Sequence, residues 1–132
     1  MIPPKIPKTQ KHSEFFGRLF QLRDQIHLRH LFPTNAGKLG SFAEHSALNS
    51  FYESILNLAD SLIESYQGKC GIVEISIPAS KVPNNVIGLI KEFAAMTEKG
   101  AYDTFEESWI KNQLDGMSEL AYSTIYKLEN LK

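Results

Sequence analysis

The chain has 132 residues, of which 42% are hydrophobic and 22% are charged, and its formal net charge is −1 at pH 7. This length predicts one domain that buries about two-thirds of the surface exposed by the unfolded chain. The composition is ordinary for a soluble globular protein, and the near-zero net charge argues against a chain-wide attraction to nucleic acid or to membranes.

Three features bear on cellular location. Cys70 is the single cysteine, so no intramolecular disulfide can form, which fits a reducing compartment. No apolar run approaches the ~20 residues of a membrane span, and the N-terminus lacks the apolar core of a signal peptide. We therefore expect a cytoplasmic protein with no membrane contact.

The first twelve residues, MIPPKIPKTQKH, contain three prolines and three lysines. Prolines at positions 3, 4 and 7 disfavour a regular helix and predict an extended arm, followed by a single domain over residues 13–132. The lysines could bind the phosphate backbone of DNA, and the alternative is a solvated leader. These lysines are Lys5, Lys8 and Lys11.

A first helix is predicted over residues 13–32. Ser13 is a suitable N-cap, and apolar residues recur at helical spacing as far as Leu31. Pro33 ends the helix, and residues 33–40 are expected to form a loop. His27 and His30 are three residues apart and therefore share one face of the last turn.

The second helix is predicted over residues 41–67. Ser41 and Glu44 form a capping box at its start, and Gly68 is a natural C-terminal stop. Four polar side chains of this helix lie within about 100° of one another, beside the apolar stripe. They are His45, Asn49, Asp60 and Glu64.

The remainder predicts an extended connection and two more helices. Residues 69–83 break the helical pattern, and the β-branched run at 72–77 predicts a short strand or an extended crossover. A third helix follows Pro83 and ends at Gly100. The fourth opens at Asp103 or Thr104, where Thr104 and Glu107 form a second capping box. The predicted fold is an all-α four-helix bundle with a crossover between helices 2 and 3.

The polar face of the second helix predicts a metal site. Asp60 and Glu64 are one turn apart and can share an ion, and carboxylate with imidazole is a ligand set that suits iron. His45 is separated from Asp60 by roughly 22 Å along the axis, so one copy cannot close the site. Two antiparallel copies could, with His27 or His30 adding a ligand. The alternative is that these residues border a core or subunit surface.

An iron site inside one bundle is not predicted. Ferritin-type internal sites use Glu-x-x-His motifs on helices facing each other, and that pattern is absent. The predicted third and fourth helices contain no histidine.

The order His30, His45, Asn49, Asp60, Glu64 resembles that of the Dps proteins, which are mini-ferritins of the ferritin-like superfamily. The whole chain is similar to a phage-encoded, Dps-like domain family whose function is not established. The similarity rests on the stretches RDQIHLRHL, SFAEHSALNSFYESILNLADSLIESYQGKCGIV and STIYKLENLK.

This resemblance implies a ferritin-like fold and a homo-oligomer formed through helices 1 and 2. It implies an inter-subunit site that binds iron (Fe2+/Fe3+), with weak ferroxidase activity, and a role in iron sequestration or DNA protection. Asn49 stands where the family has a carboxylate, which removes a negative ligand. The alternative is a non-enzymatic phage protein on the same bundle, a virion or assembly component in contact with other virion proteins. A phage-encoded protein would be found in the host cytoplasm or in the virion.

Overall fold

The fold is all-helical. A computed structural model describes residues 7–32, 34–35 and 38–132, and four helical rods account for most of this part of the chain. Helix α3 continues through the π-helix η1 into α4, so these three form one rod. The elements are α1 (Lys8–Leu31), β1 (Thr34–Asn35), β2 (Lys38–Leu39), α2 (Phe42–Cys70), α3 (Val86–Ala95), η1 (Met96–Ala101), α4 (Tyr102–Thr104) and α5 (Ser108–Asn130).

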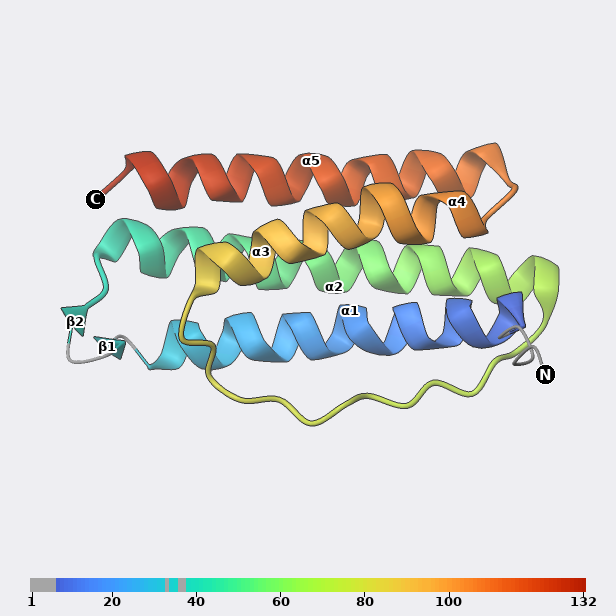
Figure 1. Ribbon diagram of the computed structural model, residues 1–132, viewed down its shortest axis with the longest axis horizontal. Helices are drawn as coiled ribbons and strands as arrows, with labels where there is room; N and C mark the ends of the chain where they lie inside the picture. Colours follow the sequence, from blue (N-terminus) through green and yellow to red (C-terminus); the bar gives the residue numbers. More distant parts are fainter. Residues whose placement is uncertain (1–6, 33, 36–37) are drawn as a thin grey trace, which may run out of the picture.

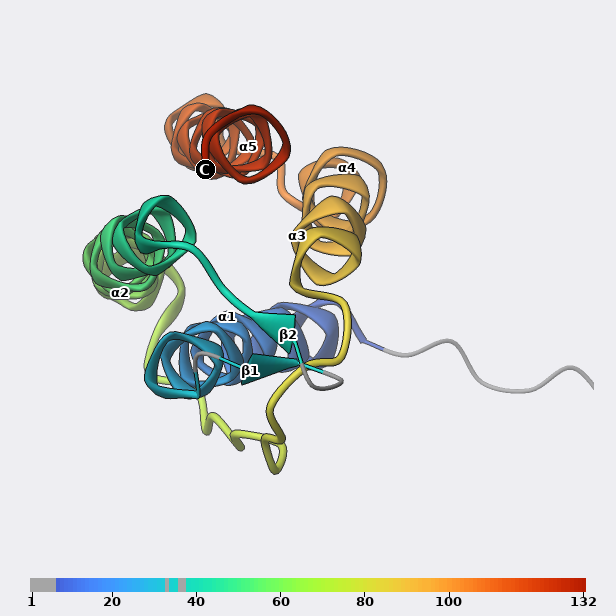
Figure 2. The same ribbon diagram turned by 90° about the vertical axis from the view of Figure 1, so that its left-hand side faces the viewer.

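The four rods pack around one hydrophobic core (Figures 1 and 2). Helix α1 packs on α2, α2 on α5, and α5 on α3. Rods α2 and α3–α4 run in the same direction, whereas α1 and α5 run in the opposite one. Every rod contributes side chains that are completely or almost completely buried. The largest include Phe16, Leu19, Phe51, Ile55, Ile90, Phe105, Ile110 and Leu114.

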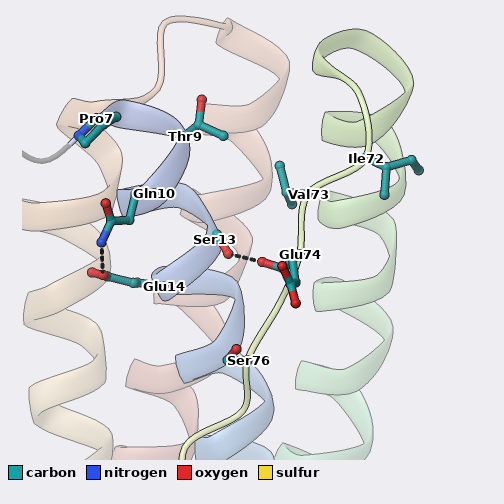
Figure 3. A pocket seen from close by; sticks show the side chains of 9 residues that line it. All are labelled: Pro7, Thr9, Gln10, Ser13, Glu14, Ile72, Val73, Glu74 and Ser76. Atoms are coloured by element: carbon teal, nitrogen blue, oxygen red, sulfur yellow. Dashed lines mark hydrogen bonds between the residues drawn. The ribbon is translucent and has the colours of Figure 1, made fainter.

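An extended crossover over residues 71–85 makes the parallel arrangement of α2 and α3 possible. It leaves the end of α2 and runs back along α1 to the start of α3 (Figure 1). The Ser13 hydroxyl donates a hydrogen bond to the carbonyl of Glu74 (Figure 3), and Gln21 Nε2 donates to the carbonyl of Ala79 at 2.9 Å. The expected crossover is confirmed, but the segment forms no strand, because no other backbone segment in the described part of the chain forms hydrogen bonds with its backbone.

Gly17 sets how closely the crossover approaches α1. A Cβ atom at this position would collide with the backbone carbonyl of Ser76. Glycine is therefore required here for close backbone approach, although it weakens a helix intrinsically.

The predicted N-terminal arm is wrong for residues 8–12. Helix α1 begins at Lys8, with Pro7 at the N-cap position, and extends five residues further towards the N-terminus than expected. A proline at the start of a helix is tolerated because the first N–H groups have no partner within the helix. His12 is 7% exposed, so this first turn belongs to the folded domain. The rest of the predicted arm lies outside the described residues.

Other helix boundaries also differ from expectation. Ser41 caps α2 by accepting a hydrogen bond from the Glu44 N–H at 3.0 Å, as predicted, but the helix passes Gly68 and ends at Gly71, whose φ is 94°. A positive φ favours glycine, which explains why the later glycine is the stop.

The third rod likewise does not end at Gly100. It continues as a π-helix and reaches Thr104. The Thr104 hydroxyl donates to the carbonyl of Ala101 instead of capping the next helix, and α5 begins later, at Ser108. Both predicted boundaries were wrong because buried packing of Ala101 and Phe105 places the corner further along the chain.

Two smaller findings complete the fold. The predicted loop at 33–40 contains a short antiparallel hairpin in which Thr34 pairs with Leu39 and Asn35 with Lys38. Among the described residues, no helix is both long and apolar enough to cross a membrane.

We predict that Gly17→Ala destabilises the protein by about 1–3 kcal/mol, because the crossover must move away from α1. Chemical denaturation monitored by circular dichroism measures the change. The matched control is Gly68→Ala, since nothing lies within 4 Å of a Cβ added there. This control should be neutral or stabilising by up to about 1 kcal/mol. Equal stability of Gly17→Ala and wild type would contradict the proposed contact.

Candidate functional site

A buried ion pair joins the end of α1 to the start of α2. Arg29 Nη2 lies 2.8 Å from Glu44 Oε1, and the two side chains are 6% and 22% exposed. Arg29 Nη1 also donates to the carbonyl of Phe32 at 2.6 Å. The guanidinium therefore links the last turn of α1, the chain leaving it and the first turn of α2. This link sets the register of the two helices at this end of the protein.

That register brings His30 and His45 together. Their rings stack with centroids 3.8 Å apart and planes inclined by 22°. His30 Nδ1 lies 3.0 Å from the backbone carbonyl of His45. A carbonyl only accepts, so Nδ1 must carry the hydrogen, and Nε2 keeps the lone pair that a metal ion requires. His30 is half-buried and His45 is exposed.

An aromatic cluster lies next to the histidine pair. His27 stacks on Tyr52 with ring centroids 4.3 Å apart, and its ring centre lies 6.2 Å from that of His30. The Tyr52 hydroxyl donates to Asn49 Oδ1 at 2.9 Å. Asn49 therefore holds the tyrosine in place with the oxygen that could otherwise bind a metal. Of the two candidate histidines on α1, His30 is the one placed directly against His45.

Asp60 and Glu64 do not join this cluster within one chain. Both are exposed on α2, towards its other end. The rise of the helix keeps them roughly 22 Å or more from His45 along its axis. Within the described ranges there is no group of three or more histidine, cysteine, aspartate or glutamate residues able to hold a metal ion. The structure thus unites the histidines and leaves the predicted carboxylates apart.

The stacked arrangement has a chemical consequence. A metal ion bound by imidazole lies near the plane of the ring, along the nitrogen lone pair. Two stacked, nearly parallel rings cannot both have the same ion in their planes. Binding by both residues would require a rotation of one ring. His45, being exposed, can rotate without disturbing the core, whereas the hydrogen bond of His30 holds its ring in place.

The predicted DNA-contacting lysines are placed as follows. Lys5 lies outside the described residues. Lys8 is in the first turn of α1 and forms an exposed ion pair with Glu106 at 3.1 Å. Lys11 is exposed on the same helix.

A fourth histidine, His12, occupies a buried site at the opposite end of the protein. Its Nε2 lies 2.9 Å from the carbonyl of Thr104, and its Nδ1 lies 3.0 Å from the hydroxyl of Tyr66. The ring also stacks on Phe105, with centroids 3.9 Å apart. Because the carbonyl must accept, Nε2 carries the hydrogen and Nδ1 accepts from the tyrosine. His12 thus ties α1 to α2 and to the corner before α5.

The sequence contained a signal for this residue that was missed. His12, Phe16 and Leu19 follow helical spacing, which places His12 on the buried face of α1. The prolines before it led to the interpretation as an extended arm. Burial lowers the pKa of His12 below its ordinary value of 6.5, and the hydrogen bond to the Thr104 carbonyl opposes this only in part.

The fold and these contacts define an all-helical protein with an exposed histidine pair where its first two helices meet. Comparison with known proteins adds a family. Residues 38–128 match the family of unknown function DUF5856, and the chain belongs to that family. No curated protein and no solved structure gives a match.

We predict that Arg29→Ala destabilises the protein by about 2–3 kcal/mol. Removing one member of a fully buried ion pair costs about 3–5 kcal/mol, and the partial exposure of Glu44 reduces this. Urea denaturation measures the change. The control is Lys91→Ala, which breaks the exposed pair with Glu129 and should alter stability by no more than about 0.5 kcal/mol. Similar effects of the two substitutions would refute a structural role for the buried pair.

We also predict that the free energy of unfolding falls as the solution is acidified below pH 6.5. The unfolded chain takes up a proton on His12 near its ordinary pKa of 6.5, whereas the folded protein does so only at a lower pH. The contribution of His12 to the free energy of unfolding is complete above pH 6.5, and it is lost as the pH falls through the lowered pKa. Denaturation between pH 8 and 5 should show a steeper decline for wild type than for His12→Gln. Parallel curves would show that His12 does not contribute.

Proposed function

We propose that this protein is a ferritin-like, Dps-like homo-oligomer that binds iron between two copies of α2. The observation that carries the proposal is the contact of His30 with His45, which presents imidazole nitrogen at an exposed position on the same helix as Asp60 and Glu64. Imidazole and carboxylate together form a ligand set that suits ferrous iron.

An antiparallel pair of α2 helices would complete the site. When two copies run in opposite directions, His45 of one lies opposite the turn that carries Asp60 and Glu64 of the other. The centre of such a pair falls near Glu53, which is exposed on α2. The arrangement is isologous, so it forms two equivalent sites.

The charges on this face indicate that the pairing depends on a cation. Symmetry brings two Glu53 carboxylates near each other, and like charges in contact oppose association. Glu64 and Asp60 add negative charge at each end, and Asn49 adds none. A bound divalent ion offsets this repulsion. Iron would be the substrate of such a site: two ferrous ions would each give one electron to one hydrogen peroxide molecule, which would take up two protons and yield two molecules of water.

Anaerobic titration of the protein with Fe(II), measured by isothermal titration calorimetry, tests the proposal. We expect saturable binding to wild type and at least tenfold weaker binding to Asp60→Ala and to His45→Ala, because each loses one ligand. Asp115→Ala is the control, since that residue is exposed on α5, away from the proposed site. Addition of peroxide to the loaded protein should then yield Fe(III) faster than in buffer.

The outcomes separate two functions. Absence of saturable Fe(II) binding, or equal binding by Asp60→Ala and Asp115→Ala, would overturn the iron site. The protein would then be best described as a non-enzymatic interaction protein, such as a phage virion or assembly component.

A further inference from the structure

The crossover carries an unpaired backbone edge. Residues 72–77, with the sequence IVEISI, run extended along α1 and make no backbone–backbone hydrogen bond to any other described segment. Two of their apolar side chains are exposed, Ile72 to 85% and Ile77 to 53%. Proteins usually shield an extended, β-branched edge with a neighbouring strand, a charge or a proline. The first proline after this run is Pro78.

The contacts with α1 identify which edge is free. The carbonyl of Glu74 accepts from Ser13, and the carbonyl of Ser76 abuts Gly17, so both point towards α1 (Figure 3). In an extended chain, successive backbone groups point to opposite sides. The N–H and C=O groups of Ile75 and Ile77 therefore point away from α1, and no hydrogen bond in the described structure engages them.

We propose that this edge is a homodimerisation site at which the crossovers of two copies pair as antiparallel strands. The pairing is centred on Ile75, which lies opposite Ile75 of the second copy. Ile77 N–H then donates to the carbonyl of Val73 across the interface. A self-complementary edge of this kind suits a two-fold axis, because each copy supplies the same donors and acceptors.

Charge and side-chain pairing favour this register. Centring on Ile75 places Glu74 opposite Ser76 and Val73 opposite Ile77, so an apolar pair forms and the carboxylates stay apart. Centring on Glu74 would place two carboxylates directly opposite each other, which is destabilising. The register at Ile75 uses the free edge and separates the charges.

One existing contact borders this edge, because the N–H of Val73 donates to Gln67 Oε1 of α2 at 3.1 Å. The free edge points away from α1, so the order across the interface is helix, strand, strand, helix. The two bundles lie on opposite sides of the two-stranded ribbon. None of the proposed iron ligands belongs to this edge, so the inference does not depend on the proposed iron site.

Sedimentation velocity of the full chain in EDTA tests the proposal. We expect a concentration-dependent dimer in wild type. Ile77→Pro removes one outward N–H per copy, keeps an extended backbone and should weaken the dimer at least tenfold. Ile77→Ala retains the N–H and should weaken it by about threefold or less. A circular dichroism melt of each variant confirms that the bundle is intact.

A disulfide trap tests the register. In a Cys70→Ser background, Glu74→Cys with Ser76→Cys places cysteines opposite each other at a non-hydrogen-bonded pair, where Cα atoms are ~4.5 Å apart and a disulfide can form. Mild oxidation should yield a covalent dimer. Glu74→Cys alone should not, because two such residues are diagonal neighbours ~7–8 Å apart.

Three results would overturn the proposal. They are a monomeric wild type at all concentrations, a dimer equally stable in Ile77→Pro and Ile77→Ala, and efficient trapping through Glu74→Cys alone.

Discussion

The close contact between the crossover and α1 is the constraint on which the arrangement of this protein depends. Helices α2 and α3 run in the same direction, so the chain must return along the whole bundle between them. It does so against α1, where Gly17 allows the Ser76 carbonyl to approach the helix backbone. Val73 and Ile75 pack against the core from this segment. The crossover is therefore part of the folded structure, and no hydrogen bond in the described part of the chain engages the N–H and C=O groups of Ile75 and Ile77.

The two ends of the bundle are held by different chemistry. At one end the ion pair of Arg29 and Glu44 fixes how α1 meets α2, and the histidine pair follows from that geometry. At the other end a neutral histidine, His12, links three elements through two hydrogen bonds and an aromatic stack. The first end presents its imidazoles to solvent, whereas the second removes one from it. This difference explains why the exposed pair, and not His12, is the candidate ligand.

The predicted site was only partly assembled by the fold. Sequence spacing placed His45, Asp60 and Glu64 on one side of the second helix, and the loop length suggested that His30 would come near. The structure does place His30 against His45. The carboxylates remain apart because a straight helix separates them, so any complete site needs a second copy. That requirement follows from the rise of the helix alone, and the iron itself stays a prediction.

Some features were predictable from the sequence because they depend on neighbouring residues. The helical periods, the Ser41 cap and the break after the second helix are local, and each was found. The true start of α1, the passage of α2 through Gly68 and the late start of α5 were not predicted. These depend on His12, Phe105 and Gly71 meeting distant parts of the chain or adopting a particular backbone angle. The sequence by itself determined an all-helical chain with an extended connection. Only the tertiary structure decided which residues are buried and which backbone edge is free, since both result from packing between segments remote in sequence.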